Sequence, residues 1–146
     1  MTSRDPFNLQ RFVDAQNPVF EAVRRELQEG RKRSHWMWFI FPQLKGLGSS
    51  QTAVYFGIAS RTEAETYLQH SILGPRLHEC TRLVNHVDGR SIEEIFGYPD
   101  DLKFRSSMTL FAAAQPENPD PEHRVFQEAL DKYFAGAPDP QTIERL

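Results

Sequence analysis

Apolar residues recur at helical spacing along most of the chain. The segment 18–29 carries Val19, Val23 and Leu27 at four-residue steps and is followed by Gly30, a residue typical of helix ends. Comparable stripes occupy segments 75–88 and 121–135, and each is again followed by a glycine. This pattern predicts amphipathic helices that bury one face.

Helix-start signals divide the rest of the chain in the same way. Ser60 to Glu63 and Ser91 to Glu94 have the spacing of a capping box, in which a serine and a glutamate side chain each accept a backbone N–H. Prolines and aspartates mark further starts near residues 6, 18, 75, 100 and 121. Together these signals predict seven helices, and a short further helix after Asp139-Pro140.

Two short apolar segments, Trp36–Phe41 and Ala53–Ile58, do not fit a helical stripe. Both are rich in aromatic or β-branched residues, which favour strands. We expect them to be buried as extended or irregular pieces that either pair with each other or line the centre of the fold. Since no clear strand ladder is visible, the sequence predicts an all-α or mainly α protein, a compact single-domain bundle covering residues 1–146.

Composition narrows the setting without identifying an activity. Hydrophobic residues make up 39% of the 146 positions, which argues against disorder, and the net charge of -3 gives no reason to bind duplex nucleic acid or an anionic membrane. Cys80 is the only cysteine and lies on an apolar helix face, so we expect it in the core, in a reducing compartment. The first ten residues lack a signal-peptide pattern, and no apolar run is long enough to span a bilayer. We therefore expect a soluble, cytoplasmic protein.

Motifs for metals and common cofactors are missing from the sequence. No histidine pair has the spacing of a helical zinc site, and one cysteine cannot form a thiolate cluster. Gly46 and Gly48 have no third glycine at the offset of a dinucleotide fingerprint. We expect neither a metal site nor a cofactor.

The densest candidate chemistry lies in residues 34–50, SHWMWFIFPQLKGLGSS. Its central run, with Met37, Phe39, Ile40 and Phe41, is expected to belong to the core. The polar flanks of this run are the part that needs another explanation, because polar groups beside apolar ones must find partners.

Three residues at the start of this segment have chemistry to offer. Trp36 and Trp38 each carry one indole N–H and a flat face on which a planar ligand can stack. His35 titrates near neutral pH and is the candidate for proton transfer. The alternative for His35 is a packed histidine with a structural hydrogen bond.

The end of the segment is a candidate anion site. Lys45 and Ser49 flank Gly46 and Gly48, whose backbone N–H groups can approach a phosphate closely. The order differs from a P-loop, in which the lysine follows the glycines. A plain tight turn is therefore the alternative.

A second candidate set lies in residues 100–114, DDLKFRSSMTLFAAA, where apolar residues surround the whole helix and predict a buried one. Lys103, Arg105, Ser106 and Ser107 nevertheless occupy its first half. Cations near a helix N-terminus oppose its dipole. Either the aspartates of the first turn or a bound anion must compensate them.

These two motifs, together with LGPRL, closely resemble the bacterial domain-of-unknown-function family 1810 (DUF1810). The resemblance covers about Asp5 to Leu146 and implies a compact, mostly helical single domain. Tyr98 and Phe56 are mild departures from the family pattern, which has a small residue and a tyrosine there. Members sometimes carry the label "calpastatin", but that inhibitor is a disordered repeat protein and this chain has neither property. The resemblance implies no established reaction.

The leading hypothesis is a domain that binds a small anionic ligand with a planar group, such as a nucleotide or an ADP-ribose-like compound, with His35 as acid or base if chemistry occurs. The predicted binding residues are Trp36, Trp38, Gln43, Lys45, Gly46, Gly48, Ser49, Lys103, Arg105, Ser106 and Ser107. The alternative is a non-enzymatic protein-interaction module in which the same polar residues form a structural network. Convergence of the cations on an open cleft favours the ligand hypothesis, and ion pairs to carboxylates in the interior favour the alternative.

Overall fold

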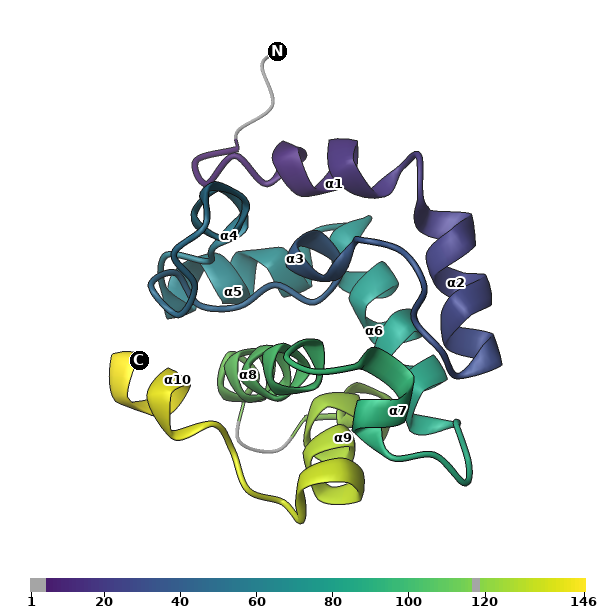
Figure 1. The fold of residues 1–146 in the computed structure, drawn as a ribbon. Coiled ribbons are helices and arrows are strands. Elements are labelled where there is room, and N and C mark those ends of the chain that lie inside the picture. The colour runs from purple at the N-terminus through teal and green to yellow at the C-terminus, as the bar shows by residue number, and fades with distance from the viewer. Residues whose placement is uncertain (1–4, 117–118) are drawn as a thin grey trace.

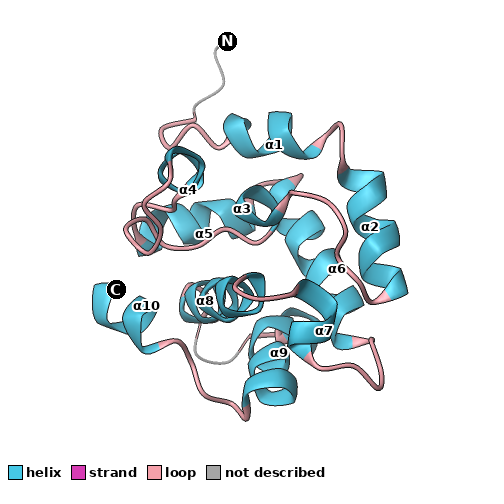
Figure 2. Ribbon diagram, viewed as in Figure 1, coloured by secondary structure: helices cyan, strands magenta, loops and turns pink. Residues whose placement is uncertain are grey.

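A long helix, α8 (Asp100–Ala113), occupies the centre of the protein (Figure 1). The computed structural model describes residues 5–116 and 119–146. Within those residues the chain forms ten α-helices and one short 3-10 helix, and no strand is drawn in Figure 2. The predicted all-α class is confirmed. The short helix expected after Asp139-Pro140 is present at residues 140–145, and the remaining helices outnumber the seven expected.

The apolar circumference of α8 explains its central place. Phe104, Met108, Leu110 and Phe111 are completely buried, whereas Leu102 is 46% exposed. The helix packs most extensively against four others. They are α5 (Arg61–Gln69), α7 (Ile92–Phe96), α9 (Val125–Phe134) and α10 (Pro140–Arg145).

The N-terminal helices cover the other side of this core. The predicted helix over 18–29 is α2 (Phe20–Glu29), which packs against α6 (Leu73–Asn85). It ends at Gly30, which adopts the left-handed conformation with φ 75°. The first helix, α1 (Gln10–Gln16), begins later than the Asp5-Pro6 signal suggested, because the Asp5 carboxylate accepts the N–H groups of residues 9 and 10.

The two segments expected to be extended are helical for most of their length. Within Trp36–Phe41, residues 37–40 form a single turn, α3 (Met37–Ile40). Most of Ala53–Ile58 belongs to α4 (Gln51–Phe56), and its residues 54 and 55 are exposed. The expected extended conformation was wrong in both segments, because one or two helical turns are too short to show a stripe that distinguishes them from strands. The expected burial is confirmed for Trp36, Met37, Ile40 and Phe41.

A trace of the expected pairing does exist, one step further along the chain. Leu44 and Ile58 form an isolated parallel bridge, in which Lys45 N–H donates to Ile58 O at 2.7 Å and Ile58 N–H donates to Gln43 O at 2.9 Å. This bridge fixes both ends of the loop that carries the glycines of the first motif.

A buried ion pair ties this region to α1. Arg11 Nη2 lies 2.9 Å from Glu63 Oε2, and both side chains are less than a tenth exposed. Arg11 also donates to the carbonyl oxygens of Tyr55 and Gly57 at 2.8 and 3.1 Å. One guanidinium therefore positions α1, the end of α4 and the start of α5 together.

The two predicted capping boxes, at Ser60 and at Ser91, form to different extents. The capping box of Ser91 and Glu94 is present at the start of α7, as predicted. At Ser60 only half of the box forms: its hydroxyl accepts the Glu63 N–H, whereas the Glu63 carboxylate bonds to Ala59 N–H and to Arg11. The Glu63 carboxylate therefore forms the long-range ion pair with Arg11 instead of completing the capping box at Ser60.

Cys80 is 1% exposed, and burial raises the pKa of its thiol to about 12, which confirms its expected place in the core. No helix in residues 5–116 or 119–146 is long and apolar enough to cross a bilayer.

Candidate functional site

The two motifs meet in one cleft, which α3, the loop before α4, the first half of α8 and the segment before α10 form together. Figure 1 shows α10 beside α8 at the left of the molecule. The cleft has a volume of about 560 Å³, and small-molecule pockets usually measure about 300–1,000 Å³. It is lined by Trp38, Gln43, Leu47, Gly48, Ser49, Ser50, Ala53, Pro99, Leu102, Lys103, Arg105, Ser106, Asp139 and Gln141.

The first motif contributes an aromatic wall and a polar loop. Trp38 lies in α3 and is half-buried, and Gln43, Gly48 and Ser49 follow on the loop. Ser50 caps α4, since its Oγ accepts the Ala53 N–H at 3.1 Å. Ser49 does not cap the helix, so its hydroxyl stays available in the cleft.

The charge of Lys103 is only partly compensated. Its ammonium lies 5.3 Å from the centre of the Trp38 ring and 3.5 Å from Asp100 Oδ1. Asp100 Oδ2 is closer, at 3.0 Å, to the ammonium of Lys32. One carboxylate thus serves two lysines, and the charged residues of the lining are two cations, Lys103 and Arg105, and one carboxylate, Asp139.

Arg105 bonds to backbone carbonyls and not to a carboxylate. Its Nε donates to Ala137 O and its Nη2 to Pro138 O, both at 3.0 Å, and the guanidinium lies 5.7 Å from the centre of the Phe134 ring. These bonds fasten the segment before α10 to α8. Nη1 has no acceptor among the described residues, so part of the guanidinium is available at the cleft.

Asp139 is a cleft residue that the sequence marked only as a helix start. Its Oδ2 accepts the hydroxyl protons of Ser106 at 2.8 Å and Thr142 at 2.6 Å, and its N–H donates to Thr109 Oγ1 at 2.9 Å. Ser106 and Asp139 are 33 residues apart. No local pattern connects them, because their contact depends on the reversal of the chain after α9.

Trp36 does not reach the cleft, which corrects its predicted role as a ligand wall. It is 1% exposed, and its indole N–H donates to Glu26 Oε1 at 2.9 Å. The same carboxylate accepts the N–H groups of Arg33 and Ser34, and its Oε2 accepts the Ser34 hydroxyl. Burial acts to raise the pKa of Glu26, but these hydrogen bonds outweigh it and lower the pKa below its ordinary value.

Ser107 is also absent from the cleft. It follows Ser106 by one position, which turns its side chain about 100° around α8 and into the core, and it is completely buried. Its Oγ has no hydrogen-bond partner among the described residues. Lys103 and Ser106 therefore line the cleft, whereas Ser107, which was predicted to bind the ligand with them, lies in the interior.

Three further predicted residues, His35, Lys45 and Gly46, are exposed and do not line the cleft. Lys45 points outward because its neighbour Leu44, at 5% exposure, points inward in the bridge to Ile58, and consecutive side chains of an extended segment alternate. His35 lies just before the buried Trp36 and does not contact the cleft lining.

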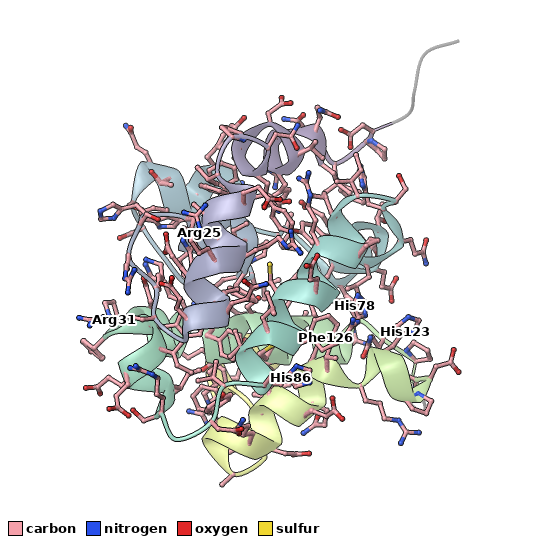
Figure 3. All side chains as sticks on the ribbon, turned by 90° about the vertical axis from the view of Figure 1, so that its right-hand side faces the viewer. Arg25, Arg31, His78, His86, His123 and Phe126 are labelled. Atoms are coloured by element: carbon pink, nitrogen blue, oxygen red, sulfur yellow. The ribbon has the colours of Figure 1, made fainter. Side chains whose placement is uncertain are left out.

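Near the end of α2 lies a basic cluster, in which three of the five cations are paired with carboxylates. It consists of Arg24, Arg25, Arg31, Lys32 and Arg33. Arg24 contacts Glu79 at 2.7 Å, and Arg33 contacts Glu29 at 2.9 Å. Figure 3 shows Arg25 on α2 and Arg31 just beyond it, apart from each other on the surface. Carboxylates thus interrupt the positive charge of this cluster.

A histidine pair lies on α6 and next to α9, in the lower right part of Figure 3. The ring centroids of His78 and His123 are 4.9 Å apart, and those of His78 and Phe126 are 5.1 Å apart. Among the described residues, no three His, Cys, Asp or Glu side chains are grouped so that they could hold a metal ion.

Fold and cleft together define a mainly helical protein whose two sequence motifs form a small, net positive cleft closed on one side by the C-terminal segment. The family described as "Protein of unknown function (DUF1810)" matches residues 6–146, so the chain belongs to that family. A crystal structure of the conserved hypothetical protein Rv1873 from Mycobacterium tuberculosis is similar over 97% of this chain and 98% of that chain, with 60% identity and a TM-score of 0.92. No curated protein matches the chain.

Proposed function

We propose that the cleft binds a small anionic ligand with a planar group, a nucleotide or an ADP-ribose-like compound. The observation that carries the proposal is the sharing of Asp100 by two lysines, at 3.0 Å from Lys32 and 3.5 Å from Lys103. Two ammonium groups and one carboxylate leave a positive charge. An anion that reaches Lys103 would neutralise it inside a cleft, where charges interact more strongly than in water.

Arg105 strengthens the argument for an anion. Its Nε and Nη2 are bonded to carbonyl oxygens, which are neutral, so its full charge persists. A guanidinium with free N–H groups is well suited to phosphate or carboxylate oxygens. Lys103 and Arg105 lie two positions apart on α8 and both line the cleft.

A planar group would find an aromatic and apolar wall beside these cations. Trp38 is half-buried, and Leu47, Ala53 and Leu102 line the same cleft. Aromatic faces bind planar rings by stacking and cations by cation–π attraction. Lys103 already lies over Trp38 at 5.3 Å, so the ring and the anion-binding ammonium are adjacent.

The proposal is confined to binding. His35, the predicted acid or base, does not line the cleft, which removes the geometric basis for its role in proton transfer there. The hydroxyl and amide groups of Gln43, Ser49, Ser50 and Gln141 supply neutral donors and acceptors for orienting a ligand.

A thermal-shift screen of nucleotides, ADP-ribose and phosphorylated metabolites tests the proposal, because a ligand that binds the native state raises its melting temperature. Lys103→Met keeps the aliphatic stem over Trp38 and removes the charge, so it should abolish the shift of any hit. Lys45→Met is the matched control, since Lys45 is an exposed lysine outside the cleft, and it should keep the shift.

The interaction-module alternative is favoured by one specific observation. Arg105, Ser106 and Thr109 all bond to the segment 137–139, as expected of residues that serve only to hold the C-terminal helix. If no compound in the screen shifts the melting temperature while Arg105→Ala lowers it strongly, this alternative replaces the ligand proposal.

A further inference from the structure

We infer that Asp139 is a specificity-determining residue of the cleft and that it accepts a hydrogen bond from a sugar hydroxyl of the ligand. The inference rests on the proposed function and deepens it. It narrows the ligand class from planar anions in general to ribonucleotides, in which a hydroxyl-bearing sugar lies between the phosphate and the base.

The starting observation is a carboxylate in a cleft whose other charged groups are cations. Lys103 and Arg105 favour an anion, whereas Asp139 repels one. A cleft built for an anion alone would bind it better without this carboxylate. Asp139 is therefore consistent with a ligand that brings a hydrogen-bond donor along with its negative charge.

The Asp139 side chain is held in one orientation. Its Oδ2 accepts hydrogen bonds from Ser106 and from Thr142, which is completely buried. Its backbone N–H bonds to Thr109, and the two preceding carbonyls bond to Arg105. A group fixed on so many sides is preorganised, so a ligand does not have to order it.

The second oxygen of the carboxylate is the available one. Oδ1 accepts no hydrogen bond from any described residue, while both hydroxyl donors go to Oδ2. An ionised carboxylate can only accept. Its ligand partner must accordingly be a donor such as a hydroxyl.

Capping of α10 does not account for Asp139. A capping carboxylate accepts backbone N–H groups of the first helical turn, and the Asp139 side chain accepts none in α10. It bonds to two hydroxyls, one of which belongs to α8. This arrangement joins Asp139 to the wall that carries the cations.

The position of Asp139 selects a sugar hydroxyl over an amino group of the base. Arg105 bonds to Pro138 O. The residue after each of these, Ser106 on α8 and Asp139 before α10, bonds to the other. The carboxylate thus belongs to the residue directly after the carbonyl that the guanidinium holds. In a nucleotide the sugar hydroxyls lie a few bonds from the phosphate, whereas an exocyclic amine lies at the far end. Carboxylates bind ribose hydroxyls in this way in dinucleotide-binding proteins.

Titration calorimetry of the full chain with ADP, 2′,3′-dideoxy-ADP and inorganic phosphate tests the inference. We expect wild type to bind ADP roughly 10- to 100-fold more tightly than the dideoxy compound, the ratio that corresponds to one hydrogen bond to a charged group. Asp139→Asn keeps the shape of the side chain and should bring this ratio close to one. Because it removes a negative charge, it should also bind inorganic phosphate more tightly than wild type does.

Asp88→Asn is the matched control, because the Asp88 side chain is 98% exposed and lies outside the cleft, and it should behave as wild type. Equal affinity of wild type for ADP and its dideoxy analogue overturns the inference and leaves the proposed function standing. A preference for ADP that survives in Asp139→Asn also overturns it. If wild type binds none of the three compounds and no hit of the screen, the proposed function fails and this inference fails with it.

Discussion

The indole N–H of Trp36 donates a hydrogen bond to the carboxylate of Glu26 at 2.9 Å, in a site that is almost closed to solvent. Glu26 lies on α2, ten residues before Trp36. The same carboxylate accepts the hydroxyl of Ser34. The first part of the motif SHWMWFIFPQLKGLGSS therefore holds α2 to the start of α3, whereas Trp38, Gln43 and residues 47–50 of the second part line the cleft.

We predict that Glu26→Gln destabilises the protein by about 1.5–3 kcal/mol, because it replaces a charged acceptor of four hydrogen bonds by a neutral amide, whose nitrogen cannot accept. Urea denaturation followed by circular dichroism measures this loss. Glu29→Gln on the same helix is the control. Its salt bridge with Arg33 is largely exposed, so it should change the free energy of unfolding by about 0.5 kcal/mol or less.

The pH dependence of stability should follow from the same carboxylate. The folded protein lowers the pKa of Glu26 below its ordinary value of 4.5, so the folded state binds this proton less readily than the unfolded state does. The stabilisation is complete above that ordinary value and is lost as the pH falls through the folded-state pKa. Melting temperatures of Glu26→Gln should consequently decline less than those of wild type between pH 5 and pH 3. Parallel declines would contradict this assignment.

Phe39 and Phe41, two residues of the aromatic run 36–41, should contribute unequally to the free energy of unfolding. Phe41 is completely buried, and Phe41→Ala should cost about 3–5 kcal/mol, the usual range for a buried aromatic. Phe39 was expected to be equally buried, but it is only half-buried. Phe39→Ala should therefore cost about 2 kcal/mol or less. Chemical denaturation of the two variants side by side measures the difference, and equal losses would refute it.

Gly74 should resist a substitution that usually stabilises helices. Glycine costs about 0.5–1 kcal/mol relative to alanine inside a helix, and Gly74 lies within the first turn of α6, not at a helix end as the sequence suggested. A Cβ there would stand 2.2 Å from the carbonyl oxygen of Leu68. Gly74→Ala should lower the melting temperature, while Arg82→Ala on the exposed face of α6 should leave it nearly unchanged.

Arg105→Lys should loosen α10 without unfolding the rest of the chain. Lysine keeps the charge but cannot reproduce the planar fork that bonds to Ala137 O and Pro138 O. Loss of about 1 kcal/mol of local stability corresponds to about fivefold faster amide exchange in α10. Hydrogen–deuterium exchange mass spectrometry should show this change in residues 140–145 and none in α6. Arg25→Lys, at an exposed position on α2, should show neither.

Most helices could be predicted because their signals are local. Val23 and Leu27 are both completely buried, as their four-residue step requires, and Ser91 and Glu94 form the expected capping box. The short helices α3 and α4 were not predicted, since one or two turns contain too few residues for helical and strand patterns to differ.

The sequence by itself determined that the chain folds as helices around an aromatic core and that two polar motifs lie beside apolar runs. Only the tertiary structure decided which of those polar residues share the cleft. Trp36 and Ser107 turn inward and Trp38 and Ser106 turn toward the cleft, although the members of each pair are one or two positions apart. Asp139 joins them from the far end of the chain. Helical periodicity acts over a few residues and can be read along the chain. The direction of a particular side chain depends on which helices pack beside it, and that packing is set by contacts between residues that are distant in sequence.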